Sequence, residues 1–159
     1  MADAKQIRQA QEVYVTLCEM LDERNWHYEK DLDELNISCG VQGDDIPMPI
    51  RITVEAERQI ILLFSHLPFD IPEDKRAEMA LAVTLINYKL VNGCFDYSPS
   101  KGTLLFRMVS SFRDCVISPD LLAYMMDVSC GTVDEYNEKL QALADGSMTF
   151  SQFKVSIDE

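Results

Sequence analysis

The sequence predicts an α+β domain in which helices pack on an antiparallel sheet, with the element order α-β-β-β-α-β-β-α. Over residues 4–23 the apolar residues recur every three or four positions, which is the period of an amphipathic helix. Over residues 26–64 and 95–109 they recur at every second position, which is the period of half-buried strands. These two groups of strands flank a helical segment at residues 73–92, and this order favours an antiparallel sheet with helices on it.

The first predicted helix has a start signal and a narrow apolar stripe. Asp3, followed three residues later by Gln6, is a suitable cap for its first turn. The stripe consists of Ile7, Ala10, Tyr14, Leu17 and Leu21. A stripe of this width is typical of a helix that packs on a single neighbour.

Four segments in the first half of the chain are predicted to be strands. They are 26–28, which is a candidate edge strand, and 35–42, 50–54 and 59–65. In the last of these, Ile60, Leu62 and Phe64 lie on one face while Ile61 and Leu63 lie on the other. Because both faces are apolar, we expect a central strand that is covered on both sides.

The segment 73–92 is predicted to be the most buried helix. Pro72, Glu73 and Asp74 suit its first turn. One apolar stripe contains Met79, Val83, Ile86 and Leu90, and Leu81, Leu85 and Tyr88 widen it. An apolar face of this breadth indicates a helix that is largely enclosed.

The second half is predicted to contain a hairpin and a long helix. Strands beginning at Phe95 and covering 104–109 are joined by a loop at Ser98–Gly102. A helix starts after Ser118, with Gly131 as a candidate break, although the apolar register continues through it and predicts collinear or gently kinked helices. We therefore expect a single domain at residues 1–145 and a loosely held C-terminal tail at 146–159.

Charge and composition limit the classes of partner. The chain has 27 acidic and 14 basic residues and a net charge of -13, which disfavours binding to nucleic acid and to anionic membranes. No apolar run approaches the roughly 20 residues that span a bilayer. The five cysteines are widely spaced without a C-x-x-C pair, as expected for reduced thiols in a cytoplasmic protein.

The sequence shows no residue pattern typical of catalysis, and we expect no enzyme activity, no cofactor and no metal site. The only histidines, His27 and His66, lie in a predicted strand and a turn, far from any recognisable nucleophile motif. No glycine-rich phosphate loop follows a strand. Arg107 interrupts an apolar strand, and we expect it to face outward and to pair with an acidic residue on the neighbouring strand.

The second half also resembles the YbjN family. The residues that carry the resemblance are Asn87, Gly93, Phe95, Gly102, Phe106, Arg107, Ser118 and Leu121. The resemblance implies the fold of the type III secretion chaperones, a curved antiparallel sheet with helices on it. It also implies a non-enzymatic role, since family members are described as bacterial sensory transduction regulators and the secretion chaperones as small acidic dimers that bind effector segments along apolar sheet surfaces.

Two functions follow as expectations. The first is a non-enzymatic protein-binding module, either chaperone-like or a regulatory adaptor of the YbjN type. The alternative is a small-ligand sensor with a pocket between the sheet and the 73–92 helix.

We also expect a homodimer, because the apolar faces of the first and last helices are wider than one narrow seam. The predicted partner-binding residues are Val13, Met20, Leu121, Leu122, Met125 and Met126. Exposed together, such residues would mark a contact site. The other interpretation is that these residues belong to the core of a monomer.

Overall fold

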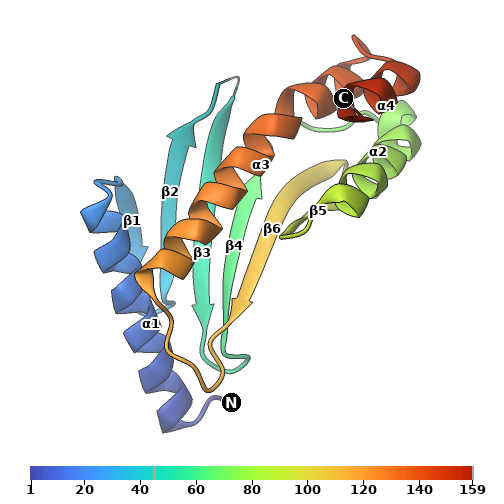
Figure 1. Cartoon of the computed structure of the whole chain (residues 1–159). Coiled ribbons are helices and arrows are strands. Elements are labelled where there is room, and N and C mark those ends of the chain that lie inside the picture. The colour runs from blue at the N-terminus through green and yellow to red at the C-terminus, as the bar shows by residue number, and fades with distance from the viewer. Residues whose placement is uncertain (45, 159) are drawn as a thin grey trace.

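The computed structural model describes residues 1–44 and 46–158, and within them it shows helices packed on a single sheet (Figure 1). The helical elements are α1 (Ala4–Glu23), the 3-10 turn η1 (Glu73–Lys75), α2 (Arg76–Lys89), α3 (Pro119–Asp145) and α4 (Phe150–Asp158). The strands are β1 (Tyr28–Asp31), β2 (Asn36–Gln42), β3 (Pro47–Glu55), β4 (Ile60–His66), β5 (Cys94–Ser98) and β6 (Thr103–Ser111). The predicted fold class and element order are confirmed.

The six strands form one antiparallel sheet in the order β1-β2-β3-β4-β6-β5. The first four strands follow one another as a meander. The chain then leaves the sheet through α2, returns as β5 at the far edge, and turns back as β6 between β5 and β4. The predicted extra edge strand exists, but it begins at Tyr28 rather than at Trp26.

The helices cover one face of this sheet, and the sequence alternation determines which face. In β3, Met48, Ile50, Ile52 and Val54 are buried, whereas the residues between them are exposed or half-buried. The buried face continues through Leu63 on β4, which is paired with Ile52, and onto β6. These side chains share one apolar core with α1, α2, α3 and α4. Each fully buried Ile or Leu contributes roughly 1.5–3 kcal/mol to folding.

Helix α1 buries a wider face than its sequence stripe predicted. The Asp3–Gln6 capping box is present. Ile7, the first residue of the predicted stripe, is exposed, while Val13 and Met20 are buried beside it. The helix lies in the angle between the sheet and α3, so it packs on two neighbours rather than one.

Helix α2 is not the most buried helix, contrary to the prediction. Met79, Val83 and Ile86 are buried as expected. Leu81 and Tyr88 are 56% and 91% exposed, so the residues that widened the predicted stripe face away from the core. The helix lies at the edge of the sheet over β5, where only one of its sides meets other elements (Figure 1).

Helix α3 is a single helix of 27 residues that passes through Gly131 without a break. It begins as predicted, with the Ser118 hydroxyl accepting a hydrogen bond from the Leu121 N–H. Glycine costs about 1 kcal/mol in a helix interior. Gly131 is exposed, and the buried residues on either side, such as Ser129 and Val133, hold the helix on the sheet.

The prediction of a loosely held tail at 146–159 is wrong for the residues that the structure describes, which end at Asp158. Gly146 adopts a positive φ of 82° and ends α3, after which the chain turns back into α4. Phe153 of α4 is fully buried. Lys139 of α3 donates a hydrogen bond to the Ser156 carbonyl, so α4 is part of the folded unit.

The edge strand β5 is held by a side chain of α2. The Asn87 Nδ2 donates to the Phe95 carbonyl at 2.9 Å, and the Phe95 N–H donates to the Asn87 Oδ1 at 2.8 Å. The amide therefore occupies the backbone donor and acceptor of Phe95 in the way a neighbouring strand would. It gives β5 a closed edge at this residue, where an open one invites pairing with other chains.

We predict that Asn87→Ala lowers the free energy of unfolding by about 1–3 kcal/mol, because it leaves two partly buried backbone groups without partners. Urea denaturation measured by circular dichroism tests this prediction. The control is Gln141→Ala, which removes an exposed amide from α3 and should change stability by less than about 0.5 kcal/mol. Equal stability of the two variants would show that the Asn87 bonds do not hold the edge.

Candidate functional site

The structure places most of the predicted partner-binding residues inside the chain's own core. They are Val13 and Met20 on α1 and Leu122, Met125 and Met126 on α3, all buried, with Leu121 half-buried. Helices α1 and α3 pack against each other, and Arg24 and Asp127 join them by a salt bridge of 2.7 Å. The fold brings these residues together, but inside the core of one chain. This is the alternative interpretation, in which they belong to the core of a monomer. The six predicted residues therefore do not form an exposed apolar margin on these two helices.

A different apolar surface lies on the face of the sheet that the helices leave open. We call it the apolar strip, and it consists of Ile60, Leu62 and Phe64 on β4 and Leu105 and Val109 on β6. Leu62 pairs with Val109, and His66 pairs with Leu105, so these side chains are neighbours across the two central strands. They alternate with the buried residues Ile61 and Leu63, and therefore point away from the helices.

The burial of Leu62 sets it apart from the main core. It is only 8% exposed, yet it does not belong to the cluster that joins the helices to the sheet. Ile60, Phe64 and Leu105 are half-buried, and Val109 is 41% exposed. The strip is thus a small second apolar cluster whose outer surface remains accessible.

The sequence contained the signal for this surface, but the interpretation was wrong. The run at 60–64 was correctly predicted to be a central strand with two apolar faces. It was expected to be covered twice, whereas all four helices lie on the side of Leu63 (Figure 1). Side-chain pattern alone does not distinguish a face that meets another element of the chain from a face that meets a partner.

An ion pair borders the strip on the β5 side. Arg107 Nε donates to an Asp96 carboxylate oxygen at 2.5 Å, and its Nη2 donates to the other oxygen at 3.1 Å. The predicted pairing of Arg107 with an acid on the neighbouring strand is therefore confirmed. These hydrogen bonds hold the pKa of the Asp96 carboxyl below its usual range. Burial, with the nearby Asp96 charge, raises the pKa of the Cys94 thiol, which also contacts Arg107.

On the β3 side the strip is bordered by Arg51. This residue pairs with Ser38 on β2 and with Phe64 on β4. Its side chain is exposed, and no acidic residue in the described part of the chain forms a salt bridge with it. Phe64 therefore lies between two arginines, of which one is paired within the chain and the other is available.

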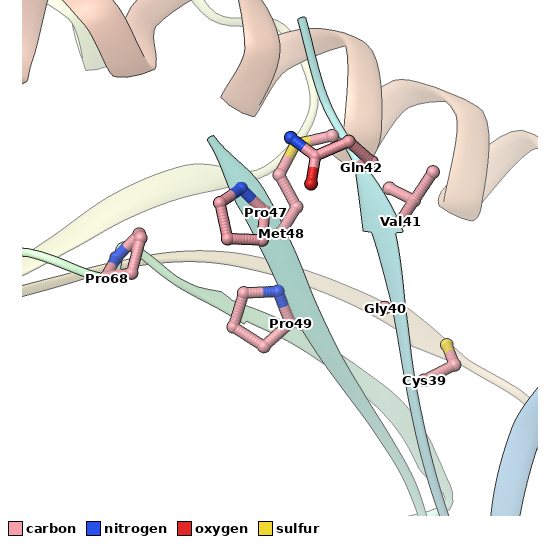
Figure 2. Close-up of a pocket in the computed structure, with 8 residues that line it drawn as sticks. All are labelled: Cys39, Gly40, Val41, Gln42, Pro47, Met48, Pro49 and Pro68. Carbon is pink, nitrogen blue, oxygen red and sulfur yellow. The ribbon is translucent and has the colours of Figure 1, made fainter. Parts of the chain in front are cut away.

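A pocket of about 420 Å³ continues the open face toward the turn between β2 and β3 (Figure 2). It is lined by Cys39, Gly40, Val41, Gln42, Pro47, Met48, Pro49 and Pro68. Figure 2 shows the rings of Pro47 and Pro49 side by side on β3, with Pro68 beyond them. The lining contains no charged side chain, so the pocket fits an apolar group. It does not lie between the sheet and α2, where a ligand pocket was expected.

The histidines and acidic residues do not assemble into a reactive centre in the described residues. His27 precedes β1 and His66 ends β4, and both are exposed. No group of three or more His, Cys, Asp or Glu residues is placed to hold a metal ion among residues 1–44 and 46–158. No helix in the same part of the chain is both long and apolar enough to cross a membrane.

These features define an α+β domain built on a one-sided antiparallel sheet with an apolar strip on its open face. The YbjN family, described as "Putative bacterial sensory transduction regulator", matches residues 14–142, and the chain belongs to this family. No curated protein matches the chain.

The solved structures that share the fold include the following three. The chain is 13% identical to YbjN of E. coli, a putative transcription regulator by its description, with a TM-score of 0.59 over 84% of this chain and 92% of that one. It is 14% identical to a chain of the HopA1-SchA chaperone-effector complex, with a TM-score of 0.57 over 87% and 99%. It is 11% identical to a chain of the ExsC-ExsE complex, with a TM-score of 0.54 over 80% and 92%. The predicted type III secretion chaperone-like fold is confirmed.

We predict that the Asp96–Arg107 pair stabilises the fold above about pH 4 and that this contribution is lost progressively at lower pH. The lowered pKa of Asp96 means that the unfolded chain takes up this proton first, so the contribution is present above the unfolded pKa of about 3.9 and is lost as pH falls through the folded pKa. Solvent screens this half-exposed pair and keeps the contribution below about 1 kcal/mol.

Urea denaturation of the wild type and Asp96→Asn at pH 7 and pH 3 measures this difference, with Glu138→Gln, an exposed α3 residue, as the control. The difference in the free energy of unfolding between the wild type and Asp96→Asn should be smaller at pH 3 than at pH 7. The corresponding difference for Glu138→Gln should not change. In Arg107→Gln, carboxyl NMR should show the pKa of Asp96 rising. An unchanged Asp96 titration in that variant contradicts the assignment.

Proposed function

We propose that this chain is a non-enzymatic protein-binding module, chaperone-like or a regulatory adaptor of the YbjN type, whose open sheet face binds an extended segment of a partner protein. The observation that carries the proposal is the apolar strip. Sheet faces in a folded chain usually bury their apolar side chains against another layer. In the described part of the chain, helices cover one face only, so the second face fits a layer supplied by another molecule.

The geometry of the open face suits an extended segment better than a globular surface. The strip follows β4 from Ile60 to Phe64, and beyond Phe64 the pocket near Gly40 and Pro49 lies beside the end of this line, on the β3 side of β4. Side chains that point to the same face of a strand recur about every 6.5–7 Å, so a partner in extended conformation would place alternate side chains along this line. The pocket fits one apolar side chain of that segment.

The similar solved structures also support a protein-binding function. Two of the solved structures with this fold are described as a chaperone-effector complex and as the ExsC-ExsE complex, so proteins of this shape bind other proteins. The small-ligand alternative has less support, because the lining is mostly apolar and Gln42 supplies its one amide side chain, whereas several convergent polar groups are what orient a small molecule.

A photo-crosslinking experiment tests the proposed face. Benzoylphenylalanine replaces either Phe64, on the strip, or Tyr124, an aromatic residue 45% exposed on α3. Position 64 should yield protein crosslinks in cells of the source organism, and position 124 should not. Phe64→Asp should lower the recovered partner about tenfold or more, because it places a charge in the apolar contact, while Tyr124→Asp leaves recovery unchanged. Equal crosslinking from both positions would refute the face as the binding site.

We also propose that the chain forms a homodimer through the outer side of α2. Leu81, Leu85 and Tyr88 follow one another along this helix at spacings of four and three and form an apolar line. Thr84, which lies among them, is uncharged. In a chain with a net charge of -13, an uncharged apolar line is where two copies approach with least repulsion.

Light scattering coupled to size exclusion should give twice the 18.1 kDa monomer mass for the wild type. The double variant Leu81→Glu/Tyr88→Glu should run as a monomer with unchanged circular dichroism, since both side chains are exposed. Val155→Glu, an exposed apolar residue of α4, is the control and should remain dimeric. A wild type of monomer mass at micromolar concentration and raised salt ends the dimer proposal.

A further inference from the structure

The charges on the open face differ from those of the chain as a whole. The charged side chains that share this face on β3, β4 and β6 are Arg51, Glu55 and Arg107, as the strand alternation and register show. Glu55 forms a salt bridge of 2.7 Å with Arg58, and Arg107 is paired with Asp96. Once these pairs are made, the charge that remains on the central strands is the guanidinium of Arg51.

The position of Arg51 relates this charge to the apolar strip. Arg51 and Phe64 are directly opposite across β3 and β4, and side chains in such pairs have Cβ atoms about 4.5–5.5 Å apart. Leu62 is the diagonal neighbour, about 7 Å away by the same geometry. Arg51 therefore lies at the border of the strip. When one side chain of a partner packs on Phe64 or Leu62, Arg51 can reach the neighbouring side chain of that partner.

We infer that the partner segment is acidic and apolar: it carries a carboxylate that binds Arg51, two residues along the chain from an apolar side chain that packs on Phe64 and Leu62. This inference rests on the proposed function of the same face. Same-face residues in an extended segment are separated by about 6.5–7 Å, which matches the diagonal spacing of about 7 Å between Arg51 and Leu62. Arginine presents a planar set of donors that binds a carboxylate through two parallel hydrogen bonds.

The overall charge alone would point to the opposite partner. A chain with 27 acidic residues repels acidic segments at long range and attracts basic ones. Next to the apolar strip the local charge is that of Arg51, whereas the carboxylates of Glu29 and Asp31, which share this face, lie two strands away on β1. A carboxylate at Arg51 therefore forms a direct pair beside apolar groups that exclude water. Salt screens the long-range repulsion between an acidic segment and the other acidic residues of the chain. The direct attraction to Arg51 therefore outweighs this repulsion.

The experiment uses an array of random twelve-residue peptides probed with the full chain. Peptides whose binding is lost in Phe64→Asp identify ligands of the open face, and these should be enriched in Asp or Glu two positions from an apolar residue. Changing that acid to Asn or Gln in the peptide should weaken binding to the wild type roughly threefold to tenfold. The same peptide change should have no effect on binding to Arg51→Gln, and Arg51→Glu should select Lys or Arg at that position.

Arg8→Gln is the matched control, because Arg8 is an exposed arginine on α1 that forms no salt bridge within the described residues. It should keep the full preference for the acidic residue. Ligands that depend on Phe64 but show no preference for an acid would overturn the role of Arg51 and leave the proposed function standing. If no peptide depends on Phe64, the proposed function and the inference both fail.

Discussion

The packing of all four helices on one face of the sheet is the constraint from which the other features follow. The alternation of β3 directs Ile50, Ile52 and Val54 into the core and leaves the residues between them on the open side. Because a sheet of six strands is wide, the helices meet it at different places: α1 lies toward the β1 end and contacts β3, α3 contacts β4 and β6, and α2 contacts β5. A one-sided core of this kind stabilises the fold while it leaves a broad surface for contact.

The residues of the family resemblance act mainly on this framework. Asn87 closes the edge of β5 by bonding both backbone groups of Phe95, and Phe95 then packs edge-on against Phe106 and Tyr136 in the core. Gly102 turns the β5–β6 hairpin with a positive φ of 73°. Arg107 alone among them faces the open side, where its pairing with Asp96 removes it from the charges that a partner would meet.

The sequence predicted the elements well because their periods and caps are local properties. It predicted contacts between elements less well. The residues Val13 and Met20 lie next to the stripe of α1, and they are core because α1 packs against α3 as well as against the sheet. For Leu81 and Tyr88 the prediction was wrong in the opposite direction: they were predicted to be buried and are exposed, because α2 lies at the sheet edge and one of its sides is free. Phe153, near the end of the chain, is buried by contacts that no local pattern predicts.

The same reasoning explains why a candidate site without reactive groups escapes sequence analysis. Ile60, Leu62 and Phe64 are ordinary strand residues, and Arg51 is an ordinary exposed charge, until the register places Arg51 opposite Phe64 and Phe64 opposite Arg107. Of the two arginines, the one with Asp96 as its neighbour is neutralised, and the one with Ser38 as its neighbour is not. The difference between a structural arginine and an available one is therefore made by the residue on the adjoining strand. That relation between distant parts of the chain determines which side of the apolar strip carries an unpaired charge.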